Sequence, residues 1–310
     1  MTCSSKRLAA LRNAIHLPRL KSSDSAAPRA FTGILTDHPG PSPLETVIIH
    51  IMPFTLSHAA AALPFRRTRL VISALVFGCF APDFGYFIPF ASRDGIGHTL
   101  MGVFEFDIPV AFVALWLFHH YAKEPLAACL PRGARNRVHI GPKSLSIKSP
   151  SRLAVILLSI LMGAATHILW DSFTHDDYWH YHHWHLLGVK VALPLFGPRP
   201  WFAIFQYISS ALGLLLILIW FVHWYRSTSP IHPRPDLRPP AVDRIVLACA
   251  FAVAFIAALV RAAAPGIPNG VHGSQRFMTD AAVTGITIFW IEVVIYGIWR
   301  NYRRRTISLA

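Results

Sequence analysis

Apolar residues run along this chain in six stretches, each long enough to cross a membrane as a helix. They cover roughly Leu70–Phe90, Val103–Tyr121, Leu153–Phe173, Phe202–Tyr225, Ile245–Ala264 and Ala281–Trp299. A bilayer core about 30 Å thick requires about 20 apolar residues of helix. Trp and Tyr stand near many of the ends, as they do at membrane–water interfaces. The pattern predicts an all-α fold, a polytopic bundle of about six transmembrane helices.

An earlier apolar stretch, Thr46–Phe65, is broken by Pro53. As a full span it would place the basic N-terminal segment on the side of the membrane where basic segments are disfavoured. We therefore predict a half-span helix over Pro53–Leu63, about 16 Å long at 1.5 Å per residue, packed against the first full span.

Residues 1–51 differ from the rest of the chain, because they are rich in Ser, Pro, Ala and basic residues and show no apolar periodicity. They are interpreted as a disordered tail, as a transit peptide, or as a segment upstream of a true start at Met52, which we favour. Residues 52–225 then form a core with four spans. Residues 226–310 add two further spans and a basic C-terminal tail.

Composition supports a membrane protein, since 54% of the residues are hydrophobic and only 14% are charged. Soluble domains carry about 25% charged residues. The formal net charge is +14, but Lys and Arg collect between the apolar stretches and do not form one basic face. The predicted partner is therefore the lipid bilayer, with no nucleic acid. The four cysteines are far apart, which excludes a CxxC-type zinc site.

Basic residues also orient the spans. They are concentrated before the first span, after the second, after the fourth and after the sixth, at Arg66–Arg69, Lys123–Arg152, Arg226–Arg244 and Arg300–Arg305. The alternate loops hold only one or two each. The positive-inside rule then predicts a multi-pass protein of a bacterial inner membrane, with both ends of the six-span core in the cytoplasm.

The most unusual polar residues lie at the end of the third stretch, in the sequence THILWDSFTH. Its three ionisable groups, His167, Asp171 and His175, are four residues apart. On a helix this spacing keeps them within an arc of about 80°. Ionisable groups are costly inside a membrane and usually have a function there.

Other ionisable groups are predicted at the same depth. Counted from the basic ends of their helices, Asp83 lies about 21 Å and His167 about 22 Å into the membrane, with Asp171 one turn further. His98 opens the second span and therefore lies on the same, outer side. His58 is predicted only about 12 Å deep, so it reaches this layer if the short helix tilts or the loop rises.

Imidazoles and carboxylates together in a dry site indicate a divalent metal such as zinc, or iron or manganese with more oxygen ligands. The candidate ligands are His58, Asp83, His98, His167, Asp171 and His175. Asp171 and Asp83 are also the candidate catalytic bases toward a metal-bound water. In the alternative interpretation, Asp83 caps a turn after Pro82, and His167 and Asp171 form an interhelical hydrogen-bond pair. The His180–His185 segment is interpreted as an aromatic interfacial helix, although its histidines could also bind metal adventitiously.

Several of these segments resemble a bacterial membrane family, domain of unknown function 4184. The resemblance rests on MPFTLSHAAAALPF, APDFGYF, GHTLMGVFEFDIP, THILWDSFTH and the region Gln206–Leu216, and covers about Met52–Tyr225. Members typically begin at the MPF motif, which supports Met52 as the start. The family implies no activity.

The ordered series His, Pro-Asp, His-Thr and His-x3-Asp is also similar to predicted membrane-bound metal-dependent hydrolases, domain of unknown function 457. The positions that match are His58, Asp83, His98, His167 and Asp171. We therefore expect a membrane-embedded metal-dependent hydrolase for a lipid-like or phosphoester substrate. The alternative is a non-enzymatic scaffold or small transporter that uses the same groups as a buried polar network.

Overall fold

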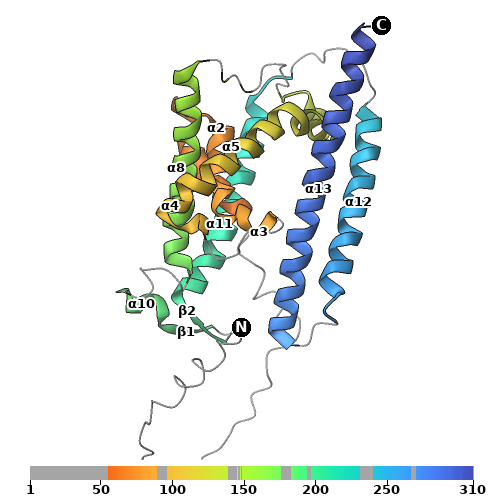
Figure 1. Ribbon diagram of the computed structural model, residues 1–310. Coiled ribbons are helices and arrows are strands. Elements are labelled where there is room, and N and C mark those ends of the chain that lie inside the picture. The colour runs from red at the N-terminus through yellow and green to blue at the C-terminus, as the bar shows by residue number, and fades with distance from the viewer. Residues whose placement is uncertain are drawn as a thin grey trace, which may run out of the picture. The chain divides into compact units, whose positions relative to one another are not determined.

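The computed structural model describes residues 55–88, 96–138, 145, 147, 149–175, 183–193, 197–230, 240–266 and 270–309. The predictions for residues 1–51, for a start at Met52 and for Pro53 lie outside these residues. The prediction of an all-α fold is confirmed, because helices make up most of the described chain (Figure 1). Its two short strands, β1 (Lys190–Leu193) and β2 (Gly197–Pro200), form one antiparallel hairpin.

Five helices among the described residues are long and apolar enough to cross a membrane, which makes the chain a membrane protein. They are Leu100–Cys129, α8 (Pro150–Thr174), α11 (Trp201–Ser227), Ala241–Ala263 of α12 (Pro240–Ala263) and Arg276–Arg304 of α13 (Gly270–Leu309). The short helices α7 (Arg132–Arg135) and α10 (His185–Gly188) lie in the connections.

The first predicted span is shorter than the sequence suggests and is interrupted. It consists of α2 (Ile72–Phe80), the 3-10 turn η2 (Ala81–Asp83) and α3 (Phe84–Phe87). Pro82 lies at the interruption, where its ring removes a backbone donor and disfavours a continuous α-helix. The break places Asp83 at a bend in the chain and not on a regular helix face.

The helix Leu100–Cys129 is continuous but not uniformly α-helical. Its segments are α4 (Leu100–Gly102), the π-segment η4 (Val103–Asp107), α5 (Ile108–Leu117), the π-segment η5 (Phe118–Ala122) and α6 (Lys123–Cys129). At the end of η4 the Ile108 N–H donates to the Val103 carbonyl, five residues earlier. The next residue, Pro109, has no N–H to continue the α-helical pattern. Such π-turns are frequent at functional sites.

The predicted half-span helix is present as η1 (Thr55–Arg67), which is a 3-10 helix. A 3-10 helix rises about 2.0 Å per residue, so it reaches further into the membrane than an α-helix of equal length. Its residue Ala62 is buried against α2, with Leu75 and Cys79 in the same apolar cluster. On the α11 side, a Cβ at Gly213 would lie only 2.8 Å from the Ser57 carbonyl oxygen, so the glycine permits this approach.

Helices α2, α5 and α8 share the main apolar core, formed by buried residues that include Ala74, Ala111, Leu115, Ile156 and Ile160. Helices α2 and α8 approach most closely at two glycines, one on each helix. A Cβ at Gly78 would clash with the Ile160 carbonyl, and a Cβ at Gly163 would clash with the Leu75 carbonyl. Small residues at such a crossing let membrane helices pack backbone to backbone. Figure 1 shows α8 and α2 alongside each other.

Helices α12 and α13 pack on each other and contact the rest through α3, η5 and α6. A polar network joins them at one end. The Arg300 guanidinium lies 2.6 Å from Glu124 and 3.2 Å from Asp243, and the Tyr296 hydroxyl donates to Asp243 at 2.6 Å. At the other end Arg261 lies 4.0 Å from Asp280.

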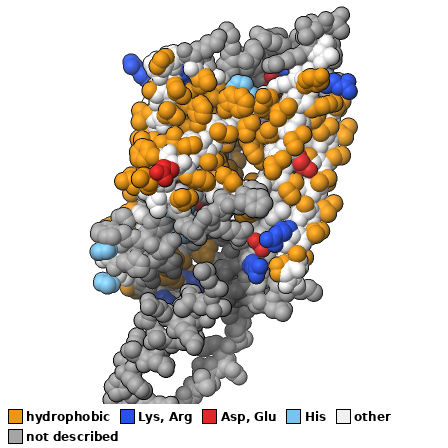
Figure 2. All heavy atoms as spheres, viewed as in Figure 1, with side chains coloured by type: hydrophobic (Ala, Val, Ile, Leu, Met, Phe, Trp, Pro, Cys, Tyr) orange, Lys and Arg blue, Asp and Glu red, His pale blue; other side chains and the backbone are white. Residues whose placement is uncertain are grey.

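Large apolar side chains remain exposed on the helices, as expected where lipid covers them. Figure 2 shows hydrophobic side chains across much of the visible surface, with Lys and Arg mainly toward its upper and lower margins. On α11, Gly213 is the one buried residue of the helix, while Ile208, Leu212, Leu218 and Ile219 are each more than half exposed. The bilayer is therefore the natural environment of this chain.

Candidate metal centre

The six predicted site residues come from four segments that end in the same region of the structure. His58 lies on η1, Asp83 ends η2, and His98 ends the 3-10 turn η3 (Ile96–His98). His167 and Asp171 lie near the end of α8, and His175 is the residue that caps it. The residue after His98, Thr99, caps α4, because its hydroxyl accepts a hydrogen bond from the Gly102 N–H at 2.9 Å.

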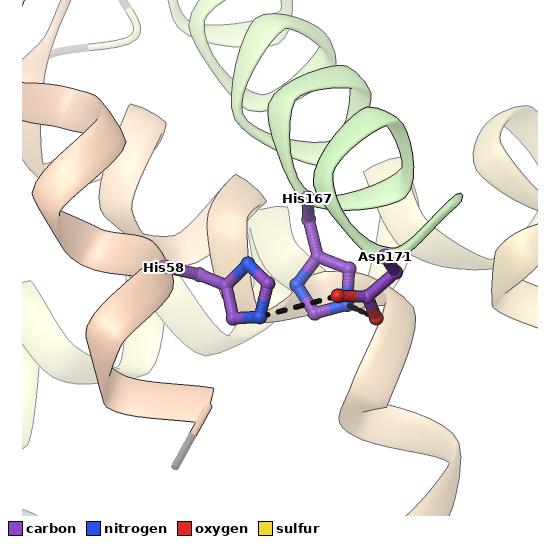
Figure 3. Close-up of side chains that lie close together, drawn as sticks. All are labelled: His58, His167 and Asp171. Carbon is purple, nitrogen blue, oxygen red and sulfur yellow. Dashed lines mark ion pairs between the residues drawn. The ribbon is translucent and has the colours of Figure 1, made fainter. Parts of the chain in front are cut away.

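Asp171 is the common neighbour of the histidines. Its Oδ1 lies 3.4 Å from His58 Nε2, and its Oδ2 lies 3.0 Å from His167 Nε2. Oδ2 is also 3.8 Å from both His98 Nε2 and His175 Nδ1. The structure thus brings all four histidines around one carboxylate that is only 5% exposed. Figure 3 shows the carboxylate directed toward the rings of His58 and His167, which come from different helices.

Asp83 approaches the same histidines from another side. Its Oδ1 lies 3.7 Å from His167 Nε2 and 3.8 Å from His98 Nε2. Asp83 also occupies the N-cap position of α3, but its side chain makes no capping hydrogen bond. The alternative in which Asp83 serves to cap a turn is therefore not supported, and its carboxylate belongs with the histidines.

The hydrogen bond of His167 determines which ring nitrogen faces the site. Its Nδ1 lies 2.7 Å from the backbone carbonyl of Cys79, which can only accept, so Nδ1 carries the proton. In the neutral ring, Nε2 then presents a lone pair. A carbonyl that orients a histidine in this way is the usual partner behind a metal-ligating imidazole.

The pair His167 Nε2 and Asp171 Oδ2 is close but is not aligned as a hydrogen bond. Among the described atoms, His167 Nε2 and Asp171 Oδ1 are buried without a hydrogen-bond partner. The two residues also share one helix, which excludes an interhelical pair. Two acceptor atoms about 3 Å apart repel each other unless a proton or a metal ion lies between them. Neighbouring ligands of a zinc ion have about this separation, because metal–ligand distances are about 2.0–2.2 Å.

Two sets of three side chains, within the described part of the chain, have the spacing that one metal ion requires. The first set is His58, His167 and Asp171, and the second is Asp83, His98 and His167. In each, the possible ligand atoms lie within 4.8 Å of one another. The rings of His58 and His167 are stacked with centroids 4.1 Å apart, which places their nitrogens side by side (Figure 3).

His175 lies at the edge of this group. Its Nε2 is 3.2 Å from the Gln206 amide nitrogen, and its Nδ1 is 3.3 Å from the Thr174 hydroxyl. Its side chain is 31% exposed, against 7% for Asp171. His175 belongs to neither three-residue set, so its role as a ligand remains a prediction. Of the His-rich segment that follows, residues 176–182 lie outside the described chain.

Asp107 is a polar residue beside this group that sequence reasoning did not select. It ends the π-segment η4 and is fully buried, and neither carboxylate oxygen has a hydrogen-bond partner among the described atoms. The charged groups near enough to act on it electrostatically are His98, His167 and Asp83. An acidic residue inside an apolar stretch was a signal available in the sequence.

Comparison with known proteins identifies one family. The profile described as "Domain of unknown function (DUF4184)" matches residues 52–298. This range includes all the segments that carry the sequence resemblance and extends through α12 into α13. The resemblance to domain of unknown function 457 is not confirmed. No curated protein and no solved structure matches the chain.

Proposed function

Because the chain belongs to the family of domain of unknown function 4184, whose description names no activity, we propose its function from the site itself. The protein acts as a membrane-embedded, metal-dependent hydrolase on a lipid-like ester or phosphoester. The observation that supports this proposal is the convergence of His58 from η1 with His167 and Asp171 from α8. Their ligand atoms are at metal-ligand spacing, and among the described residues His167 Nε2 and Asp171 Oδ1 are buried without a hydrogen-bond partner.

These three residues offer two imidazole nitrogens and one carboxylate oxygen. That donor set, with a remaining position for water, is typical of catalytic zinc sites. The Cys79 carbonyl fixes the His167 ring, and His58 stacks against it, so the ligands are held before an ion arrives. A bound divalent cation would supply an acidified water and a positive charge to stabilise the reacting oxygen.

The carboxylates provide the proton transfer that hydrolysis requires. A carboxylate oxygen of Asp83 or Asp171 that does not face the ion accepts the proton of the water. The water oxygen forms a bond to the carbonyl carbon or phosphorus of the ester, and the bond to the leaving oxygen breaks. The carboxylic acid then returns its proton to that oxygen, which leaves as an alcohol.

The exposed side of the site supports a lipid-like substrate. The side chains of Asp83 and His98 are 17% and 16% exposed, so the centre is not sealed. Beside it, Leu100 is 83% exposed and Leu169 is 60% exposed, both on helices that cross the membrane. A molecule that reaches Asp83 past such residues must itself have an apolar part. The positive-inside rule, applied to the basic loops, supports a location of this end of the bundle on the periplasmic side of a bacterial inner membrane.

The test is the metal content of untagged protein purified in detergent without chelators under anaerobic conditions. We expect at least one stoichiometric divalent ion per chain by mass spectrometry, and its loss in His167→Ala and Asp171→Asn. The matched control is His223→Ala, an exposed histidine on α11, which should leave the metal content unchanged. Protein without metal under these conditions would refute the proposal.

A second measurement separates catalysis from a non-enzymatic role. Metal-loaded protein is incubated with vesicles of bacterial lipid extract, and released alcohols, acids and phosphates are identified by mass spectrometry. We expect products that depend on both the metal and Asp83. A protein that holds its metal but releases nothing from any lipid or phosphoester would support the scaffold or transporter alternative instead.

A further inference from the structure

The two three-residue sets at the site share one side chain, His167. One set adds His58 and Asp171 to it, and the other adds Asp83 and His98. Within each set the possible ligand atoms lie within 4.8 Å of one another, but the five residues do not form a single set among the described residues. The site thus offers two neighbouring positions for an ion. We call them the inner position, beside His58 and Asp171, and the outer position, beside Asp83 and His98.

The two positions compete for the same nitrogen of His167. Its Nδ1 donates its proton to the Cys79 carbonyl at 2.7 Å. Its Nε2 has a single lone pair and therefore binds one ion. A zinc ion lies about 2.0–2.1 Å from a ligating imidazole nitrogen, so two positions that share this nitrogen are at most about 4 Å apart. An ion can thus move from one position to the other without leaving His167.

The outer position is closer to the protein surface than the inner one. The side chains of Asp83 and His98 are 17% and 16% exposed. Those of His167 and Asp171 are 0% and 7% exposed, and that of His58 is 9% exposed and stacks on the His167 ring. An ion that arrives from outside the bundle therefore meets Asp83 and His98 first.

Asp171 is placed to draw the ion inward. Its Oδ2 lies 3.8 Å from His98 Nε2 and 3.0 Å from His167 Nε2, and its Oδ1 lies 3.4 Å from His58 Nε2. One carboxylate is therefore within reach of both positions. It is also the more buried of the two carboxylates, and opposite charges attract more strongly where less water screens them. An ion at the inner position leaves Asp83 without a metal bond, as its proposed role as a base requires.

We propose that a divalent cation enters the protein at the outer position and is passed by His167 to the inner position, where it stays. This inference rests on the proposed metal centre and adds the route by which its ion is loaded. Asp83 and His98 are entry ligands, and the site holds one ion at a time. Asp83 becomes available as a base only after the ion has moved inward.

The experiment measures the rates of metal uptake and release separately. Full-length protein is stripped of metal in detergent, and Zn²⁺ uptake and release are followed by stopped flow with a metal-binding dye. We expect Asp83→Asn and His98→Ala to lower the association rate constant about tenfold or more, because charged groups at an entrance raise association rates by about 10–1,000-fold. The ion leaves by the same route, so the equilibrium affinity should fall by a smaller factor.

His58→Ala is the matched variant, because it removes a ligand of the inner position only. It should keep the wild-type association rate constant and release Zn²⁺ at least about tenfold faster. His223→Ala, exposed on α11, should change neither rate. If Asp83→Asn and His98→Ala instead bind Zn²⁺ at the wild-type rate and lose affinity only through faster release, Asp83 and His98 are permanent ligands and the proposal is overturned.

Two measurements on the wild type cover the case in which the variants do not fold. We expect one Zn²⁺ per chain at saturation. Two ions would overturn the shared-ligand argument, and no ion would overturn the proposed function as well. The rate of Co²⁺ uptake, followed by absorbance, should level off as the Co²⁺ concentration rises, because transfer from the outer to the inner position becomes limiting. A rate that stays proportional to the Co²⁺ concentration would overturn the entry position while leaving the single-ion centre intact.

Discussion

Gly163 is the α8 glycine at the close crossing with α2, one helical turn before His167. Replacement by alanine adds one methyl group where there is no space. Its carbon would lie 2.7 Å from the Cys79 nitrogen and 2.8 Å from the Gly78 carbonyl carbon, and closer still to the Leu75 carbonyl oxygen. Ordinary contacts of a Cβ begin near 3.4 Å. The two helices must therefore move apart by about 1 Å, an overpacking that typically costs about 1–3 kcal/mol.

The same movement affects the site, because the carbonyl that orients His167 belongs to Cys79 on α2. At 2.7 Å this hydrogen bond has no slack for a displacement of that size. Loss of such an orienting partner commonly lowers metal affinity about 10–100-fold. We therefore expect Gly163→Ala to reduce stability and metal affinity together.

Both quantities can be measured in detergent, by unfolding with increasing sodium dodecyl sulfate and by competition with a metal-binding dye. The matched control is Gly285→Ala on α13, where the added Cβ would lie 3.3 Å from its nearest neighbour, the Ala258 Cβ. It should change the free energy of unfolding by less than about 1 kcal/mol, and helix propensity favours the alanine. A Gly163→Ala protein as stable as the wild type, with the same metal affinity, would refute the geometry described for this crossing.

Two further predictions concern a helix cap and a buried ion pair. Thr99→Val removes the hydroxyl that caps α4. We expect the free energy of unfolding to fall by about 1 kcal/mol and metal binding through the neighbouring His98 to weaken. Thr99→Ser keeps the hydroxyl and should keep the wild-type stability and metal affinity. Arg300→Met leaves the Asp243 carboxylate, which is 2% exposed, without its cation and should cost about 3–5 kcal/mol. Combining it with Asp243→Asn should recover much of that loss, and a double variant no more stable than the single one would contradict the pairing.

The sequence was sufficient to predict the helical membrane fold and the meeting of several polar groups. Counting residues along α8 placed His167 and Asp171 correctly relative to Asp83, because α8 is one regular helix and each residue adds the same rise. The same counting underestimated how far His58 lies from the basic end of its helix. Its segment is a 3-10 helix, in which eight residues reach about 16 Å and not about 12 Å.

Asp107 was missed for a related reason. Helical periodicity relates His98 to Asp107 only if the intervening turns are α-helical, and they include a 3-10 turn and a π-segment. Each departure rotates the following residues to another face of the helix, so no count from His98 could predict that Asp107 lies beside it. The close approach also depends on Gly97, because a side chain there would clash with the Pro82 carbonyl oxygen. The sequence alone does not show that the Pro82–Asp83 turn packs on this glycine.

The order of the site residues along the chain has a consequence for how the protein is made. His58, Asp83 and His98 precede His167 and Asp171 by at least 69 residues. At about 5–20 residues per second, the ribosome needs several seconds to synthesise that interval. During this time Asp83 and His98 enter the bilayer before α8 exists to complete their surroundings. For the proposed metal centre, insertion of the early segments would therefore precede capture of a cation. A cell short of metal would then accumulate the inserted protein without its ion.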